Sequence, residues 1–309
     1  MIYYRVLVTT LLNVLCLLSE AQVTSSSFRS GKAYSIAFTL TEYNNISVPA
    51  ILNNTDTVNL MFHTAASSVT LTEESIKKIK SIRFSETTDS IKSWGGQSNT
   101  SRTSLHNSIK IGDLTWEDVS IFENVYSGQY TDGKFGPDLF KGRVIEIDFD
   151  KSVITLHDDL PVKSKQYEKV GLTIQDDLLF LNADCSIEGN NFKHKYLIHS
   201  GYSGAILFDD KFAAENLLAE RLQITGEKSL KDSYGNILKT KQAVLPQFNI
   251  QKLILKNVPS GFFEGAIGRQ KMSILGGDVL KRFNLIIDAK REFIYLKPNK
   301  WIYSDYRKM

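Results

Sequence analysis

Two histidines occupy closely similar surroundings in the sequence. His63 follows the mostly apolar run 58–62 and precedes Thr64, and His199 follows the apolar run 196–198 and precedes Ser200. A neutral imidazole has one hydrogen-bond donor and one acceptor, so it can give or take a proton during a reaction. Imidazoles also bind Zn, Cu, Ni or Fe. Acid–base catalysis and metal binding are therefore both open to this pair of residue types.

A metal site would need more than these two side chains. A catalytic zinc usually has three protein ligands. The third could be Asp138, Asp278 or His106, none of which stands at a diagnostic spacing, and the chain has no HExxH or CxxC motif. We therefore expect no cofactor. A divalent transition metal such as zinc, held by His63 and His199, remains the alternative.

The sequence contains an internal repeat. Identical residues recur 140 positions apart at Ser93/Ser233, Gly95/Gly235, Gly136/Gly276, Asp138/Asp278, Lys141/Lys281 and Asp148/Asp288. His63 and His199 are 136 positions apart, so one small insertion aligns the two halves. Such ordered self-similarity predicts two structural units of one kind.

The elements that must position these residues are mainly strands. Short apolar runs rich in Ile, Val, Phe and Tyr alternate with Gly, Asn and Asp. Helical periodicity is confined to 73–82 and 211–220. We predict an all-β protein with minor α content: two homologous lobes, 23–160 and 167–300, related by a pseudo-two-fold axis. A linker, 161–166, joins them, and a tail, 301–309, follows.

The repeated motifs resemble those of the bilobal pepsin-like and retropepsin-like aspartic proteases. Each lobe of that family has an apolar strand ending in Asp-Thr/Ser-Gly and, later, an apolar-apolar-Gly strand threaded beside that loop. The matching segments here are 62–67 with 134–136, and 198–201 with 274–276. The chain looks most like the exported aspartyl-protease-like proteins of Bacteroidota. The resemblance implies two lobes with a cleft between them and the two motif loops meeting at its floor.

The chain departs from this family at the positions that carry the chemistry. His63 and His199 stand where the resemblance implies the two catalytic aspartates, and Ala65 replaces the glycine of the first motif. Aspartic proteolysis needs two neighbouring carboxylates that share a proton. Imidazoles cannot hold the attacking water in the same way. We therefore expect no pepsin-type peptidase activity, although the two rings should still face each other.

Three interpretations of the histidine pair stay open. The first is a pseudoprotease, whose cleft binds a peptide or other small ligand without cutting it. The second is a metal site, and the third is a hydrolase that uses the imidazoles directly. In each case the contact between two buried rings should hold the pKa of at least one below the ordinary value of about 6.5.

The resemblance also suggests residues that contact a substrate around the pair His63 and His199, called the dyad below. Thr64 and Ser200 keep the hydroxyls that lock the two loops together in the family, and Gly201 completes the second motif. Trp94 and Tyr234, each followed by Gly, suit the tips of hairpin flaps over the cleft. The alternative is that each aromatic side chain packs against a turn and has no contact with a ligand.

The N-terminus has the pattern of a secretory signal peptide. Arg5 precedes the apolar run 6–18, which is too short to cross a bilayer of about 30 Å as a helix. Ser19 and Ala21 suit cleavage after residue 21, so we expect a signal peptide at 1–21, export to the periplasm or the extracellular space, and no membrane span afterwards. The balanced charge, 37 Lys and Arg against 34 Asp and Glu, speaks against a nucleic-acid partner.

Overall fold

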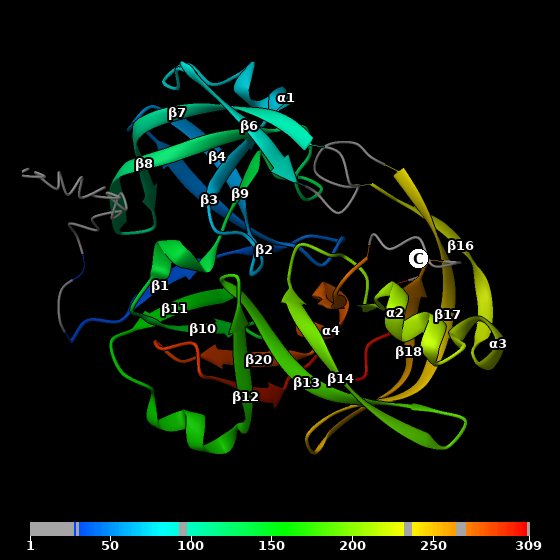
Figure 1. Ribbon diagram of the computed structural model, residues 1–309. Helices are drawn as coiled ribbons and strands as arrows, with labels where there is room; N and C mark the ends of the chain where they lie inside the picture. The colour runs from blue at the N-terminus through cyan, green and yellow to red at the C-terminus, as the bar shows by residue number, and fades with distance from the viewer. Residues whose placement is uncertain (1–27, 29–30, 93–97, 232–236, 264–269, 308–309) are drawn as a thin grey trace, which may run out of the picture.

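The two predicted lobes form two extended β sheets in a computed structural model (Figure 1). The structure describes residues 28, 31–92, 98–231, 237–263 and 270–307. The strands of the first lobe are β2 (Thr39–Leu40), β3 (Ile46–Leu52), β4 (Asp56–Phe62), β5 (Val69–Thr72), β6 (Glu86–Lys92), β7 (Ser98–Ile111), β8 (Leu114–Asn124) and β9 (Gly133–Phe135). Their order in the sheet is β2-β3-β4-β9-β5-β8-β7-β6, with a further pairing of β3 with β7.

The second lobe repeats the order of the seven strands from β3 to β6. Its members are β13 (Leu178–Ile187), β14 (Asn190–His199), β15 (Ile206–Leu207), β16 (Gln223–Lys231), β17 (Ile237–Ile250), β18 (Leu253–Phe262) and β19 (Ser273–Gly276). They run β13-β14-β19-β15-β18-β17-β16, and β13 also pairs with β17. Each pair of neighbouring strands from β3 to β6, and the extra pairing of β3 with β7, has its counterpart in the second lobe, so the structure confirms the internal duplication.

The remaining strands join the lobes. They are β1 (Tyr34–Ala37), β10 (Val144–Asp148), β11 (Val153–His157), β12 (Glu168–Gln175), β20 (Phe283–Ile287) and β21 (Phe293–Pro298). At the centre, β10 of the first half pairs with β20 of the second, with Ile145 opposite Ile287. Every residue of both strands is buried, so this sheet is covered on both faces.

The predicted linker, 161–166, lies beside this joining sheet. Its residues Val162–Gln166 form the 3₁₀ helix η2, between β11 and β12. The predicted tail is also ordered as far as 307. The fully buried guanidinium of Arg282 donates to the carbonyl oxygens of Trp301, Ile302 and Ser304, at 3.0, 3.3 and 2.7 Å.

The helices are shorter than the sequence predicts. The predicted helix over 73–82 ends after one turn, as α1 (Glu73–Ile76). The predicted helix over 211–220 is broken into α2 (Asp210–Glu215) and α3 (Leu218–Arg221), because Leu217 adopts a left-handed conformation with a φ of 52°. Two other short helices follow the threaded strands: η1 (Pro137–Phe140) after β9 and α4 (Gly277–Leu280) after β19.

A shared apolar core fixes the ends of the strands that carry the two histidines. In the first lobe Phe62, the last residue of β4, contacts the rings of Phe135 and Phe140 at centroid distances of 5.4 and 5.7 Å. In the second lobe Tyr196 of β14 packs edge-on against Phe248 at 5.1 Å. All five rings are almost fully buried, so the chain leaves each core at a defined point immediately before a histidine.

Candidate functional site

The threaded strands hold each histidine loop in place. In the first lobe β9 runs parallel to β4, with Phe62 opposite Phe135, and the N–H of His63 donates to the carbonyl of Phe135 at 2.9 Å. In the second lobe β19 runs parallel to β14, with His199 opposite Gly276. A Cβ at Gly136 would lie 1.7 Å from the carbonyl oxygen of Ala66. The threading geometry therefore demands glycine after the apolar strand, as the motif predicts.

Four hydrogen bonds lock the two loops together across the lobes. The Thr64 hydroxyl donates to the carbonyl of Ile198 at 2.7 Å and accepts from the N–H of Ser200 at 2.9 Å. The Ser200 hydroxyl donates to the carbonyl of Phe62 at 2.8 Å and accepts from the N–H of Thr64 at 3.0 Å. Each hydroxyl thus satisfies a buried donor and a buried acceptor of the other loop. Thr64 and Ser200 are therefore residues that fix the geometry of this site.

This lock brings the two histidines into contact. The ring centroids of His63 and His199 are 4.5 Å apart, and the ring planes meet at 60°. His63 is buried, and His199 is half-buried. The rings therefore lie face to edge at the junction of the lobes, as the pseudo-symmetry predicts.

Backbone donors define which nitrogen of each ring carries the proton. The N–H of Ala65 donates to Nδ1 of His63 at 3.1 Å, and the N–H of Tyr202 donates to Nδ1 of His199 at 2.9 Å. A nitrogen that accepts a hydrogen bond holds a lone pair, so the proton of each neutral ring belongs on Nε2. Both imidazoles therefore have the same tautomer, with N–H at the end of the ring away from the loop.

The surroundings of the rings oppose their protonation. Burial, the neighbouring His199 and the ammonium of Lys134 hold the pKa of His63 well below 6.5. Burial and Lys134 lower the pKa of His199 to about 4. A backbone hydrogen bond at each histidine acts in the opposite direction and raises the pKa, but burial is the larger effect. Both rings are therefore neutral at pH 7.

Gly201 gives His63 the room that its ring requires. A Cβ at position 201 would lie 2.2 Å from Cδ2 and 2.3 Å from Nε2 of His63. The predicted substrate-binding role of Gly201 is untested, but its packing role is clear. At the corresponding place in the first motif, Ala65 packs against an apolar cluster of the second lobe.

Asparagines of the first lobe support the second loop. The amide of Asn45 donates to the carbonyls of Ser200 and Gly201 at 3.2 and 3.4 Å. The amide of Asn44 donates to the carbonyl of Ser203 at 2.8 Å, and its oxygen accepts from the ammonium of Lys281 at 2.9 Å. Sequence reasoning missed both asparagines, because nothing in their spacing connects them to a loop 155 residues away.

The proposed third metal ligands do not join the histidine pair. Asp278 is buried in ion pairs with Lys281 and Arg282, and His106 contacts Asp118 in an exposed pair. In the described part of the chain no three His, Cys, Asp or Glu side chains gather as a metal site. A metal-binding histidine normally donates its other ring N–H to an acceptor. Here each Nδ1 faces a donor instead, so the loops as folded do not suit Nε2 ligation.

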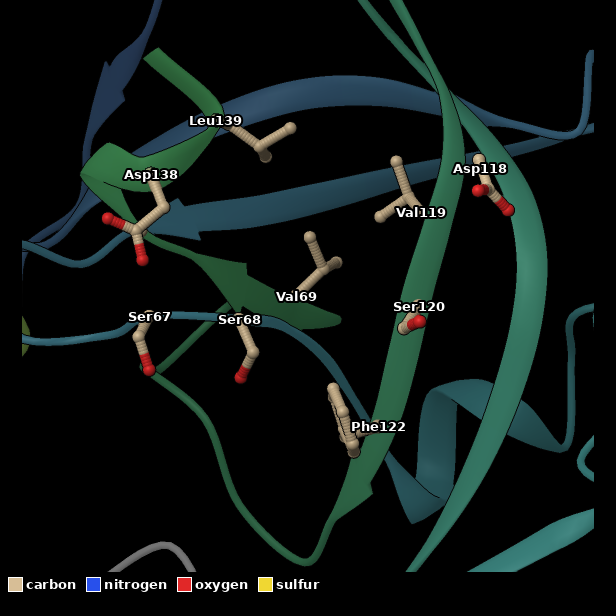
Figure 2. A pocket seen from close by; sticks show the side chains of 10 residues that line it. Ser67, Ser68, Val69, Asp118, Val119, Ser120, Phe122, Asp138 and Leu139 are labelled. Atoms are coloured by element: carbon tan, nitrogen blue, oxygen red, sulfur yellow. The ribbon is translucent and has the colours of Figure 1, made fainter. Parts of the chain in front are cut away.

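Asp138 instead lines a small cavity of about 150 Å³ on the first lobe. Figure 2 shows the apolar side chains of Val69, Val119 and Leu139 around it, with Ser67 and Ser68 on the loop that follows the histidine motif. Neither histidine is among the lining residues. This cavity is therefore separate from the dyad.

Two predicted flap residues and two further histidines complete the account of the candidate residues. Trp94 and Tyr234 lie outside the described residues. Two histidines outside the motifs pair with buried carboxylates: His157 with Glu146 and His194 with Asp209, both at 2.8 Å. Because Nε2 of His194 contacts both Asp209 and Ser273, this cluster lacks the relay geometry of a catalytic triad.

Comparisons with known proteins agree with this architecture. Residues 48–138, which include β4, the first histidine motif and β9, match the family model for aspartyl proteases. The crystal structure of an aspartic proteinase from Irpex lacteus matches with a TM-score of 0.57 at 12% sequence identity, covering 88% of this chain and 99% of that one. No curated protein matches the sequence significantly.

The fold is that of a bilobal aspartic proteinase. The chain has the duplicated lobes, the threaded strands that end in glycine, and the hydrogen bonds of Thr64 and Ser200 that join the two loops at the junction of the lobes. The helices of the described residues include none that is both long and apolar enough to cross a membrane.

Proposed function

We propose that the protein is an exported pseudoprotease that binds a peptide or another ligand in the cleft between its lobes without cleaving it. The observation that carries the proposal is the state of the two rings at the junction. Each Nδ1 accepts a backbone N–H, so each Nε2 carries the proton of the neutral ring. Neither ring then offers a free lone pair to a water molecule.

This arrangement cannot carry out the first step of aspartic proteolysis. There, an ionised carboxylate takes a proton from water while its protonated neighbour donates to the carbonyl of the substrate. The histidine pair has two donors and no available base. Burial keeps the pKa of His199 at about 4, so acid conditions add protons without creating an acceptor. Retained geometry without a base supports binding rather than cleavage.

A hydrolase that uses His63 and His199, directly or through a metal such as zinc, is the alternative. Direct base catalysis would require one ring to release its Nδ1 from the backbone donor and move its proton there. Metal ligation through Nε2 would require the same change. Elemental analysis of untagged protein tests it: stoichiometric metal that is lost in His199→Ala would favour this alternative.

Ligand binding is proposed from the way this fold uses its cleft. An extended peptide can pair its backbone with exposed strand edges, and such pairing does not depend on acidic side chains. Trp94 and Tyr234 remain candidates for contact with such a peptide, together with Thr64, Ser200 and Gly201. Export is proposed from residues 1–21, with the periplasm or the extracellular space as destination.

A paired cleavage and binding experiment tests the proposal. Fluorogenic peptide libraries are incubated with the mature protein from pH 3 to 8, and binding of the same peptides is measured by fluorescence anisotropy. We expect binding that is weakened in His63→Ala and retained in His106→Ala, with no turnover at any pH. Turnover that disappears in His63→Ala, and persists in the His106→Ala control, would overturn it.

A further inference from the structure

The cavity on the first lobe has the composition of a small ligand pocket. Its volume is about 150 Å³, the size of a cavity that takes up one benzene molecule. Its floor is apolar, because Val69, Val119 and Leu139 line it and are at most 7% exposed. Pockets for drug-sized ligands are larger, at roughly 300–1,000 Å³. This cavity therefore suits a molecule with a body of about one ring.

Polar groups without partners lie around this apolar floor. The carboxylate of Asp138 and the hydroxyl of Ser67 lie on one side of the cavity, and Ser120 lies on the other (Figure 2). Within the described part of the chain, none of these three side chains makes a hydrogen bond or an ion pair. The cavity therefore offers a ligand one anionic acceptor and two hydroxyl groups.

The internal repeat provides a comparison for Asp138. Its counterpart in the second lobe, Asp278, is 1% exposed and forms ion pairs with Lys281 and Arg282, at 2.9 and 3.4 Å. At the position that corresponds to Arg282, the first lobe has Gly142. The second lobe thus neutralises its aspartate with cations of the chain itself, whereas the first lobe leaves the corresponding carboxylate beside a cavity.

The surroundings of Asp138 disfavour its negative charge. Burial and the neighbouring carboxylate of Asp177, in the turn between β12 and β13, raise the pKa of Asp138 above its ordinary value. Lys141 and Arg291 act in the opposite direction with smaller effects. The guanidinium of Arg291 donates to carbonyl oxygens of η1, at 3.5 and 3.2 Å, and not to this carboxylate. A cation bound in the cavity would therefore stabilise the ionised form of Asp138.

We propose that this cavity binds a small primary amine in its protonated form, with an apolar body of about one aromatic ring. The ammonium donates to the Asp138 carboxylate and the Ser67 hydroxyl, and the ring packs on the apolar floor. A charge-assisted hydrogen bond fixes the orientation of the ligand. The site is separate from the dyad, so the inference does not depend on the peptide binding proposed above.

Ligands of similar shape and different charge test the site. 2-Phenylethylamine or 2-phenylethanol is added to the mature protein at pH 7.5, and ¹H–¹³C NMR follows the methyl groups of Val69, Val119 and Leu139. We expect both ligands to shift these resonances and the amine to bind about tenfold more tightly, because its hydrogen bond to Asp138 is assisted by charge. Methylamine, which has the charge without the ring, should bind more weakly than 2-phenylethylamine.

Three variants separate this site from general charge attraction. Asp138→Asn should reduce the preference for the amine to about twofold or less. Asp113→Asn, which removes an exposed carboxylate of the same lobe, should leave the preference unchanged. Ser120→Phe, which places a ring in the cavity, should abolish binding of both ligands. Far-ultraviolet circular dichroism checks that each variant is folded.

A second readout reports on the carboxylate itself. Binding of the amine should lower the pKa of Asp138, measured from the ¹³C shift of its carboxyl carbon, because the ammonium favours the charged form. Equal affinity for amine and alcohol, or a preference for the amine that persists in Asp138→Asn, would overturn the amine site. Methyl resonances that neither ligand moves would overturn the ligand pocket as a whole. Peptide binding is measured separately, so these results do not bear on the function proposed for the cleft.

Discussion

At the scale of residues, the site depends on the absence of a single carbon atom. Gly201 lies against the His63 ring, where a Cβ would approach Nε2 to 2.3 Å. We expect Gly201→Ala to reduce the free energy of unfolding by about 2 kcal/mol, because overpacking of a filled site forces the ring or the loop to move. Urea denaturation measures this change. Gly171→Ala, where no atom lies within 4 Å of the added carbon, is the matched control.

The same clash predicts non-additivity. In a His63→Ala background the added carbon has no ring to meet, so Gly201→Ala should then cost much less than in the native protein. Equal costs in both backgrounds would contradict the packing described for this pair.

The depressed pKa values predict acid sensitivity. Below pH 6.5 the unfolded chain binds protons at His63 and His199, whereas in the folded protein these rings stay neutral. The folded state therefore loses stability as the pH falls toward 4. The free energy of unfolding should decrease by about 1.4 kcal/mol per pH unit for each histidine. Denaturant titrations between pH 7 and 5 measure this pH dependence, and His199→Gln should reduce it by about half. Stability that stays level over this range would contradict neutral buried rings.

The sequence predicts which residues meet but not their protonation. The motif repeat correctly brings the side chains at 63 and 199 together. Which nitrogen holds the proton depends on backbone N–H groups of Ala65 and Tyr202, and a donor that every residue possesses leaves no trace in the sequence. The position of Lys134 near the rings could not be predicted from its spacing in the sequence either, because it follows from the pairing of β9 with β4.

At the scale of elements, the reciprocal lock should dominate the stability of the junction. Thr64→Val keeps the shape of the side chain but leaves the carbonyl of Ile198 and the N–H of Ser200 without partners. We expect a loss of about 3 kcal/mol in the free energy of unfolding, since two buried backbone groups become unsatisfied. Thr57→Val, an exposed position on the same strand β4, should change it by less than about 0.5 kcal/mol. Similar effects of the two substitutions would refute the importance of the lock.

Strands were predicted well and helices poorly, for a physical reason. Apolar runs such as 144–149 and 285–287 become fully buried strands, and burial on both faces makes their composition distinctive. The helix over 211–220 fails because Leu217 takes a left-handed conformation that leucine composition does not signal. The long strands β7 and β17 carry many polar residues, so the apolar pattern does not reveal them.

At the scale of the whole molecule, the joining sheet should make the two lobes unfold together. β10 and β20, one from each half, are hydrogen-bonded neighbours, and both are buried throughout. Separation of the lobes would therefore expose the centre of a sheet. We expect one thermal transition in which the calorimetric enthalpy equals the van't Hoff enthalpy. Two resolved transitions would show that the lobes are independent.

The buried Asn45 restricts how the protein can be made. Asn45-Ile46-Ser47 is an acceptor sequence for N-linked glycosylation, and its asparagine is only 2% exposed, with its amide bonded to the loop of the opposite lobe. A sugar attached there before folding would occupy the space in which Ser200 and Gly201 must dock. Expression in a eukaryotic secretory pathway should therefore yield chains that are either unmodified at Asn45 or unable to close.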